Sequence, residues 1–96
     1  MKRRIIQEKI EEIEQMLSES YICPIGQTIL EDPVVADDGQ TYERKYIIEW
    51  MKKSNTSPLT NEPFKSNDLK PNFMIKSQIE NWKSKLNELR NKLKMY

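Results

Sequence analysis

Hydrophobic positions divide the chain into two helical ends and a middle built from turns. Residues 1–18 repeat their apolar positions at spacings of four, three and four, which predicts an amphipathic helix that Ser18 to Ser20 interrupt. These positions are Ile6, Ile10, Ile13 and Leu17. Pro71 and Asn72 precede a second helical pattern, with Asn72 placed to cap the helix. Its apolar positions are Ile79, Trp82, Leu86, Leu89, Leu93 and Tyr96.

The middle of the chain, residues 21–72, holds all five prolines and both glycines. Val34 and Val35, a turn around Gly39 and then Thr41 and Tyr42 predict a short β-hairpin. Residues 43–53 predict a central helix of about three turns, and residues 54–64 are dense in turn formers and predict a second loop. No internal repeat is evident. We therefore expect an α+β fold with two large loops and flanking helices.

Composition narrows the function classes. The chain has 96 residues, 36% of them hydrophobic and 32% charged, and 16 Lys or Arg balance 15 Asp or Glu. Such a balance leaves almost no excess of basic residues, whereas nucleic-acid-binding domains are usually strongly basic. No apolar run approaches a membrane span, and residues 7–9, Gln-Glu-Lys, interrupt any signal peptide. We expect an intracellular protein, in the cytoplasm or the nucleus, that binds neither nucleic acid nor membrane.

Candidate catalytic chemistry is sparse. The chain has one cysteine and no histidine, so a structural zinc site with four Cys or His ligands is excluded. Cys23 has no histidine to activate it, and we expect it to be a small buried apolar group. No phosphate loop or cofactor motif is present. Two loops flanking a helix instead indicate a binding surface.

Two runs of residues resemble the U-box family, and together they extend over residues 21–83. The first run comprises Cys23-Pro24-Ile25, Asp32-Pro33-Val34, Gly39, Thr41-Tyr42, Arg44, Ile47 and Trp50. The second comprises Ser57-Pro58-Leu59-Thr60-Asn61, Leu69, Pro71-Asn72, Ile79 and Trp82. The resemblance implies a small RING-like fold without zinc. Residues 1–20 would then be an N-terminal helix and residues 84–96 a C-terminal helical extension.

In this family, hydrogen bonds and salt bridges take the place of the zinc ions of RING fingers. Loop groups that are buried without partners cost about 1–3 kcal/mol each, so good hydrogen-bonding side chains are needed. The candidates in this chain are Asp32, Asp37, Asp38, Arg44 and Lys45 around the first loop, with Ser57, Thr60, Asn61 and Glu62 in the second. Turn chemistry alone also favours such residues, so the alternative is that they are ordinary turn formers.

The resemblance implies a ubiquitin ligase domain. Such a domain binds a ubiquitin-conjugating enzyme charged with ubiquitin and positions the thioester for attack by a substrate lysine, with no covalent intermediate of its own. The docking residues that it implies are Ile25, Ile47, Trp50, Pro58 and Leu59. Core packing is the alternative role for Ile25 and for Trp50. The protein substrate cannot be identified from the sequence.

Two positions depart from the family pattern. Gly26 stands where many members have Ser or Thr. Asn61 stands where active members often have Arg or Lys, at the position thought to contact both ubiquitin and the conjugating enzyme, and an amide lacks that charge and reach. The alternative function is therefore a non-catalytic interaction or dimerisation module. The flanking helices would pack on one another in a monomer or form a helix-mediated homodimer.

Overall fold

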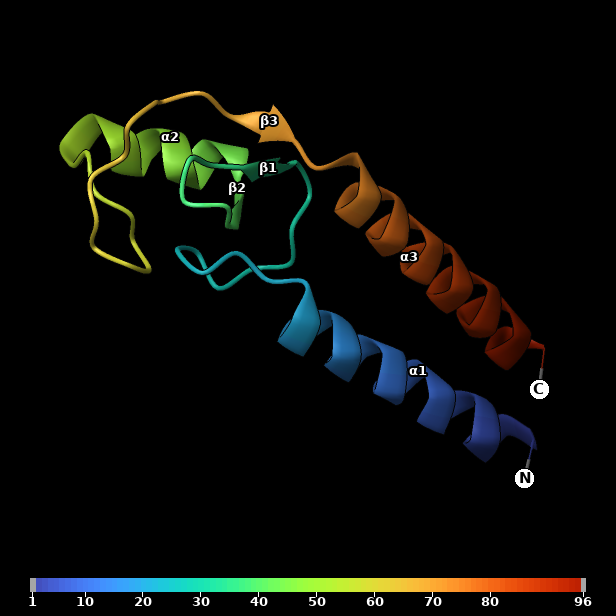
Figure 1. The fold of residues 1–96 in the computed structure, drawn as a ribbon. Coiled ribbons are helices and arrows are strands. Elements are labelled where there is room, and N and C mark those ends of the chain that lie inside the picture. Colours follow the sequence, from blue (N-terminus) through green and yellow to red (C-terminus); the bar gives the residue numbers. More distant parts are fainter. Residues whose placement is uncertain (1, 96) are drawn as a thin grey trace.

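Three helices and three short strands make up the computed structural model, which describes residues 2–95 (Figure 1). Their order is α1 (Lys2–Ser20), β1 (Pro33–Val35), β2 (Thr41–Glu43), α2 (Arg44–Lys53), β3 (Lys70–Pro71) and α3 (Phe73–Lys94). The molecule is elongated, with extents of 54 × 20 × 17 Å. The predicted α+β class is confirmed.

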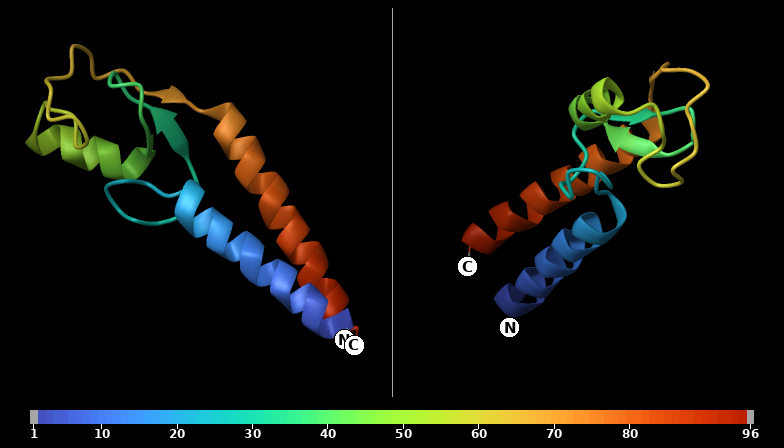
Figure 2. Two further views of the ribbon diagram at one scale, coloured as in Figure 1. Left: turned by 60° about the horizontal axis from the view of Figure 1, so that its bottom comes forward. Right: turned by 90° about the vertical axis from the view of Figure 1, so that its left-hand side faces the viewer.

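Helices α1 and α3 form an antiparallel pair, which we call the stalk, that extends away from the remaining elements, which we call the head (Figure 2). The seam between the two helices buries Ile10, Leu17, Leu86 and Leu89. An ion pair between Glu14 and Arg90, 2.7 Å long, joins the helices at the surface. The prediction that the flanking helices pack on one another is therefore confirmed.

Two details of the helical prediction are wrong. Helix α1 continues to Ser20, and the Ser18 hydroxyl is accommodated within it by donating to the carbonyl of Gln15, 2.9 Å away. Trp82 does not lie in the buried seam, since 38% of it is exposed. Tyr96, the last position of the predicted stripe, lies outside the described residues.

The head contains a three-stranded antiparallel sheet in the order β2-β1-β3. Val34 faces Tyr42 in the predicted hairpin and Pro71 on the other side. Gly39 takes φ +78° in the turn, a left-handed conformation that suits glycine. Strand β3 was not predicted, because a two-residue strand that contains a proline carries no periodic signal.

The core of the head lies between the sheet, α2 and the start of α3. It consists of Cys23, Leu30, Val34, Ala36, Tyr42, Ile47 and Ile79. The predicted cap of α3 is confirmed: the Asn72 side chain accepts from the backbone N–H of Ile75 at 3.1 Å. Its amide also donates to the Thr41 hydroxyl at 3.0 Å. The cap thereby fixes the direction of α3 against the sheet.

Candidate functional site

The first loop of the head is closed by its own backbone. The Cys23 N–H donates to Thr28 O at 2.8 Å, and the Gln27 N–H donates to Cys23 O at 2.8 Å. Gln27 takes a left-handed φ of 55° to complete the turn. Ile25 lies inside this closed segment, half-buried, with one side packed against the core of the head.

The second loop repeats this backbone pattern with every residue number raised by 34. The Ser57 N–H donates to Glu62 O at 2.8 Å, the Asn61 N–H donates to Ser57 O at 2.9 Å, and Asn61 has φ 64°. A flanking hydrogen bond from Leu30 to Tyr21 corresponds to the one from Phe64 to Asn55, and the isolated bridges correspond in the same way. The two loops therefore repeat in their backbone although the sequence shows no internal repeat.

This repeat places two pairs of residues in equivalent positions. Pro24-Ile25 in the first loop corresponds to Pro58-Leu59 in the second. Pro58 is half-buried and Leu59 is 52% exposed. Three of the predicted docking residues, Ile25, Pro58 and Leu59, therefore lie at the two loop tips and are accessible to a partner.

Helix α2 contacts both loops through aromatic side chains one turn apart. The Trp50 indole N–H donates to Thr56 O at 2.6 Å, next to the second loop. The Tyr46 ring packs on Gly26 so closely that a Cβ at position 26 would come within 2.8 Å of three ring atoms. Trp50 is half-buried, so it supports the second loop and still presents part of its surface.

Ile47 does not have the docking role that the sequence suggested. Its side chain is 0% exposed and belongs to the core of the head, because this face of α2 lies against the sheet. A partner protein cannot reach it without unfolding the head. The accessible part of the predicted docking surface is therefore Ile25, Trp50, Pro58 and Leu59.

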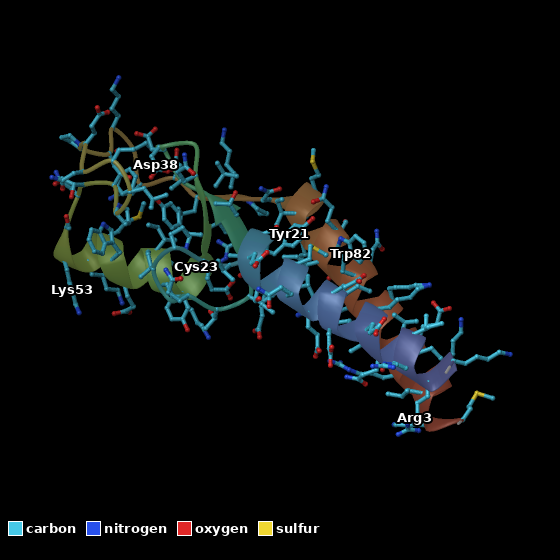
Figure 3. The ribbon with its side chains drawn as sticks, turned by 90° about the horizontal axis from the view of Figure 1, so that it is seen from below. Arg3, Tyr21, Cys23, Asp38, Lys53 and Trp82 are labelled. Atoms are coloured by element: carbon cyan, nitrogen blue, oxygen red, sulfur yellow. The ribbon has the colours of Figure 1, made fainter. Side chains whose placement is uncertain are left out.

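The predicted polar network has Asp38 at its centre, among the loops of the head (Figure 3). Its Oδ2 accepts from the hydroxyls of Ser57 and Tyr42, both at 2.6 Å, and its Oδ1 accepts from the Gln40 N–H at 2.9 Å. The Ser57 hydroxyl in turn accepts from the N–H groups of Leu59 and Thr60, both at 3.1 Å. Asp38 therefore ties the hairpin turn to the second loop.

These contacts set the protonation states of the Asp38 carboxyl and the Tyr42 phenol. Partial burial by itself raises the pKa of Asp38, but the hydrogen bonds from Ser57 and Tyr42 outweigh it and hold the pKa below its usual value of 3.8. Burial, followed by the hydrogen bond to Asp38, raises the pKa of Tyr42 far above its usual value. The carboxylate therefore stays charged while the phenol stays protonated and donates.

Other predicted network residues have separate roles. Asp37 accepts from the Lys65 N–H at 2.7 Å, and Asp32 pairs with the Arg44 guanidinium at 2.8 Å. The Thr60 hydroxyl accepts from the Glu62 N–H at 3.3 Å. The side chains of Asp32, Asp37, Arg44 and Thr60 therefore make polar contacts around the two loops.

Two residues predicted for the network do not join it through their side chains. Lys45 is exposed, with its ammonium 5.2 Å from the centre of the Tyr46 ring. Glu62 is also exposed, and within residues 2–95 its carboxylate makes no hydrogen bond, whereas its backbone closes the second loop. Both charged groups are exposed to solvent, so they keep their hydration and carry no desolvation cost.

Glu43 is a network residue that the sequence did not reveal. It is only 5% exposed, and its Oε1 accepts from the N–H groups of Glu31 and Asp32 at 2.8 and 3.0 Å. Its own N–H donates to the Cys23 sulfur at 3.3 Å. Cys23 is 0% exposed, which confirms that it is a small buried group and excludes it as an accessible nucleophile.

We expect Gly26→Ser to destabilise the head, because the added side chain overlaps the Tyr46 ring. Overpacking of this kind costs about 1–3 kcal/mol. Thermal melts of Gly26→Ser, Tyr46→Ala and the double variant measure the effect. The double variant should recover most of the stability that Gly26→Ser loses. A single Gly26→Ser variant as stable as the wild type would contradict this contact.

No three Cys, Asp or Glu side chains within residues 2–95 lie close enough together to hold a metal ion. None of the helices in that part of the chain is long and apolar enough to cross a membrane.

Comparison with known proteins identifies the relatives of this chain. The family model described as "U-box domain" matches residues 17–88, well over half of the chain. The Arabidopsis thaliana protein named "U-box domain-containing protein 51" is 46% identical over 66 residues, which cover 69% of this chain and 8% of that protein.

Two further relatives come from other lineages. "WD repeat, SAM and U-box domain-containing protein 1" of Danio rerio is 38% identical over 86 residues, 83% of this chain and 18% of that protein. "Probable bifunctional E2/E3 enzyme R795" of Acanthamoeba polyphaga mimivirus is 45% identical over 65 residues, 68% of this chain and 5% of that protein. The chain therefore spans less than a fifth of each of these relatives.

Proposed function

Because the chain belongs to the U-box family, we propose that it docks a ubiquitin-conjugating enzyme charged with ubiquitin and promotes transfer of the ubiquitin to a lysine of a protein substrate. The observation that carries this proposal is the pair of equivalent loops. They present Ile25 and Leu59 at matching positions, and Tyr46 and Trp50 of α2 contact the first loop and the start of the second. The name of the mimivirus relative, a bifunctional E2/E3 enzyme, supports the same reaction class.

The chemistry proposed for this chain is positioning. Its one cysteine is fully buried, so it cannot take ubiquitin from the conjugating enzyme as a thioester. Transfer would then pass directly from the conjugating enzyme to the substrate lysine. Docking accelerates this step only if it favours the reactive arrangement of the charged enzyme over its other arrangements.

The test is a discharge assay with the protein, a panel of ubiquitin-charged conjugating enzymes and free lysine as acceptor. We expect faster loss of the thioester with at least one enzyme of the panel, and a parallel titration should show binding of that enzyme. Binding without faster discharge would favour the alternative function, a non-catalytic interaction module. No binding to any enzyme of the panel would contradict both docking and catalysis.

Asn61 occupies the position that often carries Arg or Lys in active members. Its φ of 64° is a conformation that Asn tolerates better than most residues, which gives a backbone reason for the amide. We expect Asn61→Arg to speed single-turnover discharge by up to about tenfold, since one charged hydrogen bond contributes about 1.5 kcal/mol. Affinity for the uncharged enzyme should stay the same.

The equivalent position of the first loop provides the control. Gln27 has φ 55°, so Gln27→Arg introduces the same charge at the equivalent backbone position of the other loop. Asn61→Arg should lose about 1 kcal/mol of stability because Arg tolerates this conformation less well than Asn, whereas Gln27→Arg loses the hydrogen bond that the Gln27 amide donates to Pro24 O. Only Asn61→Arg should accelerate discharge. Equal rates for the two variants would show that position 61 has no special contact with ubiquitin.

A further inference from the structure

A groove on one side of the stalk carries lysines from both of its helices. Helix α1 contributes two lysines and two apolar residues to it, and so does α3 together with the residue that follows it. The lining residues are Lys2, Ile5, Ile6 and Lys9 of α1, Lys85, Leu89 and Lys92 of α3, and Met95 directly after α3. We call this the lysine groove. No acidic residue lines it.

On the other side of the stalk, an ion pair and a hydrogen bond cross between the two helices. Arg90 pairs there with Glu14 at 2.7 Å, and Arg3, at the far end of the stalk, donates to Leu93 O at 3.3 Å (Figure 3). In the lysine groove, by contrast, Lys85 and Lys92 contact only Glu88 of their own helix, at 3.8 and 3.4 Å. Within residues 2–95 no ion pair crosses this groove. Its two rims, one formed by α1 and one by α3, both carry lysines.

The lysines of the groove follow a helical repeat on both rims. Lys2 and Lys9 are seven residues apart, as are Lys85 and Lys92, with apolar residues at positions three or four between them. In packed helices, flanking charges at this spacing normally face charges of opposite sign. Ile5 is 55% exposed and Met95 is 83% exposed, so part of the apolar surface is uncovered.

We propose that the lysine groove binds an acidic amphipathic helix of a partner protein. Apolar residues of that helix would cover Ile5 and Met95, while its flanking carboxylates would pair with the lysines of both rims. A second copy in a two-fold contact would instead place lysines against lysines. An anionic membrane fits less well, because Glu8, Glu11 and Glu12 lie together along the same α1 helix. The proposal is independent of ubiquitin transfer.

The probe is a synthetic amphipathic peptide of about three heptads, with leucines at a and d and glutamates at e and g. A peptide of the same composition with its order scrambled is the control. Binding is measured by fluorescence anisotropy at two salt concentrations, and NMR shifts of the labelled protein locate the site. We expect the ordered peptide to bind more tightly than the scrambled one, to weaken with salt and to shift residues of the lysine groove.

Matched variants separate the groove from general charge. Lys9→Glu with Lys85→Glu should weaken peptide binding at least tenfold, about 1.4 kcal/mol. Lys76→Glu with Lys83→Glu changes the net charge equally on residues outside the groove and should leave binding unchanged. Thermal melts confirm that both double variants are folded.

Other occupants have distinct signatures. Equal weakening by both double variants, or equal binding of the scrambled peptide, would overturn the proposal. Phosphatidylserine vesicles that bind in a Lys9-dependent manner, without peptide binding, would show a membrane surface instead. Self-association in light scattering that Lys9→Glu with Lys85→Glu abolishes would show that a second copy occupies the groove.

Discussion

Replacing Asp38 by alanine should destabilise the head by about 2–4 kcal/mol. The substitution removes the acceptor of two hydroxyl groups, those of Ser57 and Tyr42, whose residues are 2% and 0% exposed. A buried hydroxyl left without a partner costs about 1–3 kcal/mol. For a domain of this size the melting temperature should fall by roughly 10–25 °C.

The neighbouring aspartate is a matched control for this change. Asp37 is exposed and accepts one hydrogen bond, from the Lys65 N–H. Asp37→Ala should therefore cost only about 0.5–1.5 kcal/mol. Calorimetric melts of the two variants at neutral pH measure the difference. Equal losses for Asp37→Ala and Asp38→Ala would contradict the central place of Asp38 in the network.

The same carboxylate predicts an acid-dependent loss of stability. Hydrogen bonds to its charged form place the pKa of folded Asp38 below its usual value of 3.8. The resulting stabilisation is complete at pH values above 3.8 and is lost as the pH falls through the lower, folded pKa. Melting temperatures measured from neutral pH downward should decline less steeply below pH 3.8 in Asp38→Ala than in the wild type.

Periodicity in the sequence predicted the elements that position the site. The stripe through Ile10 and Leu17 and the one through Leu86 and Leu89 are the two sides of the stalk seam. The hairpin and the Asn72 cap were also predictable, since both depend on residues close together in the chain. Local signals therefore give the framework of the head and the stalk.

Contacts between distant residues could not be predicted in the same way. Glu43 has the charge of a surface residue at the start of a helix, yet it is buried because it lies opposite Pro33 and accepts from the backbone of residues 31 and 32. The loop repeat is equally hidden. Its two copies share a proline followed by Ile or Leu, while Gln27 and Asn61 reach the same left-handed backbone with different side chains.

The docking prediction failed at Ile47 for a related reason. A helix of ten residues shows which face is apolar but not what covers that face. In the structure the sheet covers Ile47, whereas Ile25 lies in a loop tip that only partly contacts the core. Two isoleucines that look equivalent in the sequence therefore have different exposure, and they should respond differently to truncation.

Ile25→Ala should weaken binding of the conjugating enzyme by about 1–3 kcal/mol, the range of an interface hot spot, or roughly 5- to 150-fold in Kd. Because Ile25 is half-buried, its loss should lower stability by only about 1 kcal/mol. Ile47→Ala should instead lower stability strongly and leave affinity almost unchanged. Its side chain is fully buried, so truncation should cost about 2–5 kcal/mol of stability, with little change in affinity while the protein stays folded.

Titrations with an uncharged conjugating enzyme, run below the melting temperature of every variant, separate the two effects. Leu59→Ala is the companion variant, because Leu59 occupies the equivalent position of the second loop and is 52% exposed. The affinity of Leu59→Ala for the conjugating enzyme should fall as much as that of Ile25→Ala, and the melting temperature of Leu59→Ala should not change. If Ile25→Ala melts as early as Ile47→Ala and binds as tightly as the wild type, Ile25 is a core residue. The docking surface would then be limited to α2 and the second loop.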